Sequence, residues 1–128
     1  MEYERYDHWA WPSPPLPKNV WGALGWNWLH ALAINYPARP SLQLALETHR
    51  RIWVFLRSLP CMDCQAHSTR YFTLKQPDLR NAHALQQWAL DFHNAVNARL
   101  GKPQVSYREY LRLYADEIRR AEHARGRH

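Results

Sequence analysis

Two cysteines three positions apart, Cys61 and Cys64, are the residues of this 128-residue chain most clearly suited to chemistry. Cysteines at this spacing can close into a small disulfide ring, open again by thiol exchange, and present one sulfur to a partner. Pro60 precedes them and is suited to the first turn of a helix. A thiolate at a helix start is stabilised by the helix dipole and by free backbone N–H groups. The pair therefore favours redox chemistry.

Two other interpretations of the pair stay open at this point. His67 extends the motif to Cys-x2-Cys-x2-His, and a structural zinc ion would then take its fourth ligand from His83 or His93. The third interpretation is a pair of core cysteines with no chemistry. A thioredoxin-like domain needs strands in a βαβ unit around the motif, and no segment has a strand pattern. A redox pair here therefore needs an electron acceptor from outside that fold.

A second group of polar residues lies beside the aromatic stripes of two predicted helices. Trp26 and His30 are four residues apart and share one helix face, and so do His93 and Asn97, with Asn94 beside them. Buried histidine and asparagine side chains are costly without hydrogen-bond partners. A flat heteroaromatic ligand would satisfy them and stack on the aromatics, whereas each residue taken alone is more often an ordinary core or surface residue.

The charge of the chain also favours an anionic ligand or partner. Its formal charge is +6 and its pI is near 9.7. This balance favours a nucleic acid, a phosphorylated cofactor or an acidic protein as partner, although a basic surface alone gives the same charge. Arg99 and Lys102, near the end of a predicted helix, are placed to meet phosphates. Apolar residues make up 46% of the chain, with seven Trp and seven Tyr, which suits one globular domain.

The spacing of apolar residues predicts helices throughout, and no strand. We expect an N-terminal arm over residues 1–17, rich in proline and tryptophan, a domain over 18–121, and a basic C-terminal tail over 122–128. No run of about 18 apolar residues is present, so no transmembrane helix is predicted. The helices are expected over residues 19–36, 41–59, 61–72 and 84–100, and from 106 onward.

Caps and breaks define the ends of these helices. Asn19, Ser41 and Ser106 are predicted N-caps, the last within a capping box, and Gly101 is predicted to end the fourth helix. The final residues, 124–128, are expected to fray. The fold class is therefore all-α, a four-helix bundle with a fifth helix. The apolar stripes of the first two helices are Trp21, Leu24, Trp28, Leu29, Leu32 and Tyr36, then Leu42, Ala45, Leu46, Ile52, Trp53, Leu56 and Leu59.

Four segments together resemble the Erv/ALR family of FAD-linked sulfhydryl oxidases, over about residues 18–116. The chain is most similar to the short virus-encoded members. The order and the separations of the segments match the family as well. The segments are Trp26-Asn27-Trp28-Leu29-His30, Tyr36-Pro37, Pro60-Cys61-Met62-Asp63-Cys64, and His93-Asn94-Ala95-Val96-Asn97 continuing to Leu100-Gly101-Lys102-Pro103.

The resemblance implies a bundle that encloses the FAD ring system, with a fifth short helix and a redox disulfide against the ring. Cys64 would be the sulfur next to the flavin, and Cys61 the sulfur exposed to substrate. Dioxygen would reoxidise the flavin and give hydrogen peroxide. The residues implied to bind FAD are Trp26, His30, Tyr36, His93, Asn94, Asn97, Lys102 and Tyr114.

The resemblance also implies partners. Cellular members carry further cysteines as a shuttle pair, which this chain lacks, so a protein dithiol, expected to be a small CxxC carrier, would have to reach Cys61 directly. We expect a homodimer through the first two helices, with Leu44 and Phe55 as exposed apolar candidates, no nucleic acid and no membrane. The N-terminus lacks a signal-peptide layout, so we expect the cytoplasm, or the virion for a virus-encoded protein. The alternative is a basic helical zinc-binding module that binds nucleic acid.

Overall fold

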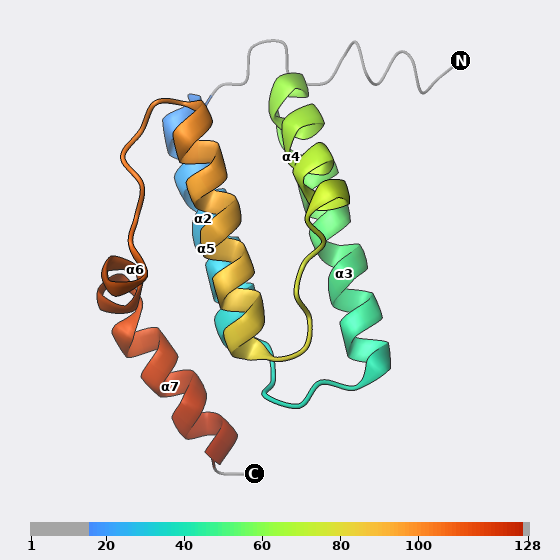
Figure 1. The fold of residues 1–128 in the computed structure, drawn as a ribbon, viewed down its shortest axis with the longest axis vertical. Coiled ribbons are helices and arrows are strands. Elements are labelled where there is room, and N and C mark those ends of the chain that lie inside the picture. The colour runs from blue at the N-terminus through green and yellow to red at the C-terminus, as the bar shows by residue number, and fades with distance from the viewer. Residues whose placement is uncertain (1–15, 127–128) are drawn as a thin grey trace.

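The computed structural model describes residues 16–126, and every regular element in that range is a helix (Figure 1). The predicted all-α class is confirmed. Most of the arm predicted over residues 1–17, and the last two residues of the predicted tail, lie outside the described range. The helices are α2 (Lys18–Asn35), α3 (Leu42–Arg57), α4 (Met62–Leu74), α5 (Ala82–Arg99), α6 (Tyr107–Leu113) and α7 (Ala115–Gly126).

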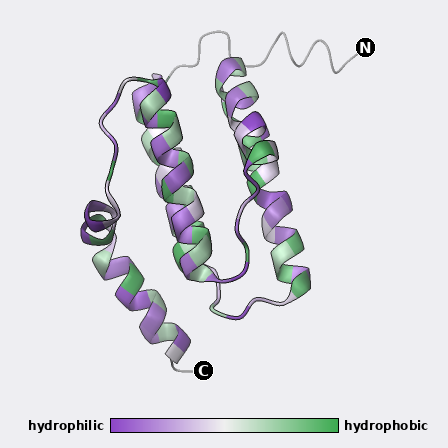
Figure 2. Ribbon diagram, in the orientation of Figure 1, coloured by the Kyte–Doolittle hydropathy of each residue, from purple (hydrophilic) through white to green (hydrophobic). Residues whose placement is uncertain are grey.

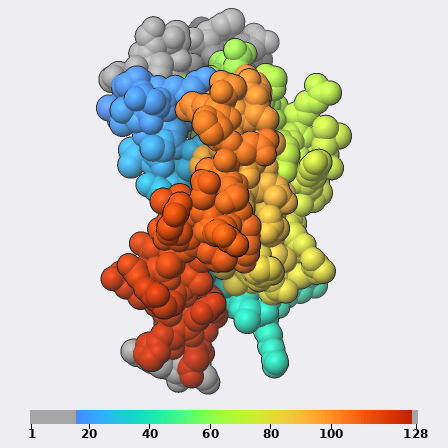
Figure 3. Space-filling view, turned by 60° about the vertical axis from the view of Figure 1, so that its left-hand side comes forward, coloured from blue at the N-terminus to red at the C-terminus, as the bar shows by residue number. Residues whose placement is uncertain are grey.

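The first four helices form two antiparallel pairs that pack into a bundle. Helix α2 lies against α5, and α3 lies against α4 (Figure 1). The start of α2, the start of α4 and the end of α5 therefore meet at one end of the bundle. Helices α6 and α7 lie along the outside, where α7 contacts α2, and their surface is continuous with those of α2 and α5 in Figure 3.

The N-caps explain where the helices begin. Ser41 and Ser106 cap α3 and α6 as predicted, each accepting a hydrogen bond from the backbone N–H three residues on. The prediction for α2 is wrong. Its N-cap is Pro17, which makes no side-chain capping bond, and Asn19 lies inside the first turn. A proline fixes φ near the value that precedes a helix, so α2 begins without a polar cap.

The predicted fifth helix is two helices. The backbone leaves helical geometry at Tyr114, with φ −113° and ψ 16°, and α7 then runs to Gly126. The fraying expected from residue 124 is therefore wrong for Ala124–Gly126. Arg125 explains the difference, because its guanidinium donates to the carbonyl oxygens of Ile34 (2.9 Å) and Tyr36 (3.2 Å) at the end of α2.

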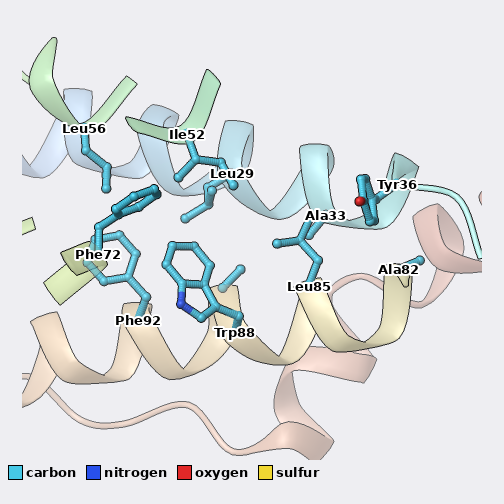
Figure 4. Packing of buried hydrophobic residues seen from close by; sticks show 11 residues of the cluster. Leu29, Ala33, Tyr36, Ile52, Leu56, Phe72, Ala82, Leu85, Trp88 and Phe92 are labelled. Atoms are coloured by element: carbon cyan, nitrogen blue, oxygen red, sulfur yellow. The ribbon is translucent and has the colours of Figure 1, made fainter. Parts of the chain in front are cut away.

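The core lies between the two helix pairs. Figure 4 shows Trp88 pointing from α5 toward Leu29 of α2, with Phe72 of α4 beside them. Figure 2 shows hydrophobic and hydrophilic residues interleaved along the helices. Four predicted core positions are instead exposed, although one of them, Trp28, stacks on Phe55 of α3 with ring centroids 4.3 Å apart. These positions are Leu24, Trp28, Leu42 and Leu46.

At the end of the bundle formed by the α2–α3 and α4–α5 connections, buried polar groups are paired within the chain. The Tyr36 hydroxyl donates to the carbonyl oxygen of Leu79 at 2.8 Å, and the Trp88 indole N–H donates to that of Lys75 at 2.8 Å. We call this the closed end. Within residues 16–126, no helix combines the length and the apolar character needed to cross a membrane.

Candidate functional site

A disulfide joins Cys61 and Cys64 at the start of α4. Cys61 is the N-cap residue of this helix, and its Sγ accepts a hydrogen bond from the Cys64 backbone N–H at 3.2 Å. Both residues are partly buried. The N-terminal turn favours negative charge on sulfur, so each cysteine is a better leaving group and a more stable thiolate here than in mid-helix.

Cys64, but not Cys61, lines a cavity of about 510 Å³ at the end of the bundle where α2 and α4 begin. We call this the open end. The volume lies within the usual range of roughly 300–1,000 Å³ for ligand sites. The walls combine aromatic, aliphatic and polar side chains from α2 to α5 and from the loop after α5. The wall residues used below are Lys18, Trp21, Gly22, Trp26, Asn27, Phe55, Cys64, Phe92, His93, Val96, Asn97, Arg99, Lys102 and Tyr114.

Trp26 and His93 form one flat stack on the cavity wall. Their ring centroids are 3.9 Å apart and their planes differ by 10°. Behind them, His30 Nε2 lies 3.1 Å from His93 Nδ1. The sequence placed these three residues on facing helices, and the contact between α2 and α5 brings them together.

Both histidines are neutral at physiological pH. Burial, with a smaller contribution from the neighbouring His93, lowers the pKa of His30 to about 4. Burial also lowers the pKa of His93 to about 4, with a smaller contribution from the positive charge of Lys102. His30 Nδ1 is buried and has no hydrogen-bond partner among the described residues. The pair therefore gives the site polarity without positive charge.

The loop after α5 carries a lysine back over the cavity. Gly101 has φ +70°, a left-handed conformation that favours glycine, and the Lys102 N–H returns to the Asn97 carbonyl oxygen at 2.8 Å. Asn97 is itself buried in the cavity wall. Tyr114, at the break between α6 and α7, donates through its hydroxyl to Asn27 at 3.0 Å. Three of the residues implied to bind FAD therefore line the same cavity: Asn97, Lys102 and Tyr114.

Three predicted cofactor residues do not line this cavity. His30 is covered by His93 and Trp26 and reaches the site only through His93. Tyr36 lies at the closed end, where its hydroxyl is bonded to Leu79.

Asn94 is the third of these residues. Its amide pairs with the backbone of Val105, donating to the carbonyl oxygen at 2.7 Å and accepting from the N–H at 2.8 Å. Asn94 therefore positions the loop that carries Lys102.

Sequence reasoning missed the cavity residues at the start of α2. Lys18, Trp21 and Gly22 line the cavity together with Trp26, although Trp21 was assigned to the core stripe. Lys18, Gly22 and Trp26 follow one another at four-residue spacing and share one helix face, and Trp21 lies beside that face, three residues after Lys18. Gly22, one helical turn before Trp26, was the available sign that this face of the helix borders a cavity.

The zinc alternative lacks the cluster that it needs. Within residues 16–126, no three His, Cys, Asp or Glu side chains are grouped so that they could hold a metal ion. His93, one proposed ligand, is stacked on Trp26 and contacts His30. The two cysteine sulfurs are joined to each other.

Comparison with known proteins gives a consistent result. Residues 23–115 match the sequence model of the Erv1 / Alr family. An FAD-linked sulfhydryl oxidase of African swine fever virus is 37% identical over 98 residues, which cover 77% of this chain and 82% of that protein. A probable FAD-linked sulfhydryl oxidase of Acanthamoeba polyphaga mimivirus is 32% identical over 94 residues, covering 71% of this chain and 66% of that protein.

The fold agrees with a solved structure of the same family. The crystal structure of the yeast Erv1 core superposes with a TM-score of 0.76 and 27% sequence identity, covering 82% of this chain and 89% of that one. The matched region contains the cysteine pair and the residues from His93 to Tyr114. The chain belongs to the Erv1/Alr family.

Proposed function

We propose that this protein is an FAD-linked sulfhydryl oxidase that forms disulfides in dithiol substrates and passes the electrons to dioxygen. One observation carries the proposal: Cys64 of the Cys61–Cys64 disulfide lines the same cavity as the Trp26–His93 stack. A redox disulfide beside an aromatic-walled cavity is the arrangement that electron transfer to a flat cofactor needs.

The residues present fit FAD. Trp26, Phe55 and Phe92 give the cavity apolar walls, and Lys18, Arg99 and Lys102 give it positive charge suited to a diphosphate. Gly22 faces open space, since a Cβ at this position would meet nothing within 4 Å. Bound FAD supplies the acceptor for two electrons, which dioxygen finally takes up as hydrogen peroxide.

We assign the holding of the cofactor to residues of the cavity wall. Trp26 and His93 offer a preformed flat surface, and the neutral state of His93 leaves a polar edge without charge. Asn97 offers amide hydrogen bonds from a buried position, and Tyr114 is held in place through its bond to Asn27. His30 and Asn94 act through their neighbours, His30 behind His93 and Asn94 on the Lys102 loop.

The chain's own sulfurs carry out the thiol steps. A substrate thiolate attacks Cys61 Sγ, the Cys61–Cys64 bond breaks, and Cys64 leaves as a thiolate. A second substrate thiolate attacks the substrate sulfur of the mixed disulfide, which forms the substrate disulfide and releases Cys61 as a thiolate. Two electrons have then moved from the substrate to the cysteine pair. Cys64 faces the cavity, from which these electrons leave.

We propose a small protein with its own CxxC pair as the substrate. The 128 residues contain no cysteine other than Cys61 and Cys64, so no shuttle pair within them can relay electrons. We propose that the substrate contacts Cys61 itself. Met62 is about half exposed beside it and gives a docking partner an apolar contact. We place this reaction in the cytoplasm.

We also propose a homodimer through α2 and α3. The predicted contact residues Leu44 and Phe55 are partly buried against the core, so they are not the exposed ones. The exposed apolar residues on these helices include Leu24, Trp28 and Val54. Sedimentation of a Trp28→Glu variant tests this, because a charged side chain in the interface would give a monomer.

Paired serine variants test the proposed oxidase. Cys64→Ser should keep bound flavin, visible in the absorption spectrum, and lose dithiothreitol-dependent oxygen consumption. Its Cys61 thiolate should also form a stable mixed disulfide with a CxxS variant of a carrier protein whose cysteine is activated as a thionitrobenzoate disulfide, releasing thionitrobenzoate, whereas Cys61→Ser should lose activity without trapping this partner. Turnover by Cys64→Ser, or purified protein without flavin absorbance, would contradict the proposal.

A further inference from the structure

The disulfide at the start of α4 has a cavity side and an outer side. Cys64 lines the cavity, whereas Cys61 does not. A thiolate attacks a disulfide sulfur in line with the S–S bond, from the side opposite the leaving sulfur. A substrate that attacks Cys61 and displaces Cys64 therefore approaches from outside the cavity. Met62, which is 49% exposed and does not line the cavity, begins the outer surface of α4 beside the attacked sulfur.

The outer face of α4 leads from Met62 to an arginine. Met62, Ala66 and Arg70 follow one another at four-residue spacing and are all exposed, whereas Ser68 and Phe72 on the opposite face are buried. Arg70 lies two helical turns beyond Met62, about 12 Å along the helix axis. Since a standard interface covers about 800 Å² of each partner, a protein docked on the disulfide reaches Arg70 as well.

Arg57 brings a second guanidinium to this surface from α3, which lies against α4 (Figure 1). It is the last residue of α3, and only three residues separate it from Cys61. Its guanidinium lies over the ring of Trp53, 5.8 Å from the ring centroid. Trp53 in turn contacts Phe72 of α4, with centroids 5.2 Å apart. The stack therefore holds the Arg57 head group on the side of α3 that faces α4.

The surface around the disulfide carries an excess of positive charge. Residues 57–75 contain three Lys or Arg side chains, Arg57, Arg70 and Lys75, and one carboxylate, Asp63. Within residues 16–126, neither Arg57 nor Arg70 forms an ion pair, although other surface arginines there do. Two arginines without carboxylate partners, beside a sulfur that another protein must reach, favour a partner with acidic groups.

We propose that Arg57, Met62, Ala66 and Arg70 form a docking face that selects dithiol proteins with acidic residues flanking their CxxC pair. The proposal rests on the proposed function, because it takes Cys61 as the sulfur that the substrate attacks. Met62 and Ala66 give the face an apolar centre, and the two arginines pair with carboxylates of the substrate at its rim. Rim charges act mainly on the association rate, so the selection should appear in kcat/KM.

Two synthetic peptides test the selection by charge. They share one reduced CxxC pair and differ only in the flanking residues, which are glutamates in one peptide and lysines in the other. With the unaltered holoenzyme, kcat/KM from oxygen consumption should be about five- to twentyfold higher for the glutamate peptide at low salt. The ratio should approach one near 1 M salt. The rate of each peptide with a small uncharged disulfide corrects for its own thiol reactivity. A corrected ratio of one at low salt, or a preference for the lysine peptide, would overturn the proposal.

A double variant, Arg57→Gln with Arg70→Gln, assigns the selection to the docking face. It should reduce the glutamate-to-lysine ratio about three- to tenfold. Because the ratio is taken within one protein, a general loss of active enzyme does not change it. Arg39→Gln with Arg108→Gln is the matched control, since it removes two exposed charges from the α2–α3 connection and from α6. The control should keep the ratio within twofold of the unaltered protein.

Two results would overturn the assignment to this face: an unchanged ratio in the double variant, or an equal reduction in the control. Failure of the proposed function gives a different result. In that case the unaltered holoenzyme oxidises neither dithiothreitol nor either peptide, whereas an enzyme without the docking face oxidises all three and does not distinguish the peptides.

Discussion

The two ends of the bundle treat their buried polar groups in opposite ways. At the closed end, Tyr36 and Trp88 donate to backbone carbonyl oxygens within the chain. At the open end, Trp21 Nε1 is buried without a described partner in the wall of a cavity of about 510 Å³, and so is His30 Nδ1 behind His93 of that wall. The closed end is complete as folded, and the open end is arranged for a ligand. Stability and cofactor binding should therefore respond to different substitutions.

Leu85→Ala should give the largest effect, and it should be an effect on stability. Leu85 is 1% exposed in the core, and Leu→Ala at such a site costs about 2–5 kcal/mol because the cavity left behind closes only partly. Val96→Ala, in the wall of the open-end cavity, is the matched variant and should cost about 1 kcal/mol in the flavin-free protein. Urea unfolding measures both, and equal losses would break the distinction between the ends.

Acid should destabilise the open end next. The pKa of His30 and that of His93 are both lowered to about 4 in the folded protein. The unfolded chain therefore binds more protons between about pH 6.5 and pH 4, and stability is lost as the pH falls through that window. We expect a loss on the order of 3 kcal/mol for the coupled pair.

His93→Gln provides the control for the pH effect. It removes one of the two groups that must stay neutral, and it removes the repulsion that lowers the pKa of His30. The slope of unfolding free energy against pH should therefore flatten between pH 6.5 and 4. The measurement is urea unfolding of flavin-free protein at several pH values. An unchanged slope would show that the acid sensitivity arises elsewhere.

Tyr36→Phe should have a smaller effect. It tests most directly whether a substitution at the closed end changes stability without changing FAD affinity. The hydroxyl that it removes is bonded to Leu79, and its loss should cost about 1 kcal/mol. FAD affinity should stay within twofold, because Tyr36 does not line the cavity. FAD titration of the flavin-free protein, followed by flavin fluorescence, and urea unfolding check both outcomes. A tenfold loss of FAD affinity with full stability would return Tyr36 to the cofactor site.

The sequence predicted elements better than it predicted orientation. Periodicity and caps located the four main helices, and Ser41 and Ser106 cap as expected because this chemistry is local. It could not tell that Leu24 is exposed, since α2 is apolar on several sides and only packing selects the buried one.

The same limit applies to the site. Spacing placed Trp26, His30 and His93 on suitable helix faces, and the fold brings them together. Asn94 was assigned to the cofactor because an asparagine in mid-helix needs a partner. That partner is the backbone of Val105, eleven residues on, which no local pattern indicates. Trp21 was assigned to the core for the converse reason, because an indole at helical spacing suits both a core and a cavity wall.

Arg125→Gln should give the smallest effect, and it tests where the folded unit ends. The sequence placed the domain boundary at residue 121, which lies inside α7. Arg125 donates to two carbonyl oxygens at the C-terminal end of α2, and cations there interact favourably with the helix dipole. Because the side chain is only partly buried, we expect a loss of about 0.5 kcal/mol.

A chain that ends at Ala121 extends this test. If α7 beyond this residue contributes to folding mainly through Arg125, the shortened chain and Arg125→Gln should lose the same stability, and both should bind FAD normally. Arg125 acts at the end of α2 next to Tyr36, far along the helix from Trp21, so a loss of FAD affinity in either variant would show that the two ends are coupled through α2. Unfolding and FAD titration of the two proteins side by side therefore measure how independent the ends are.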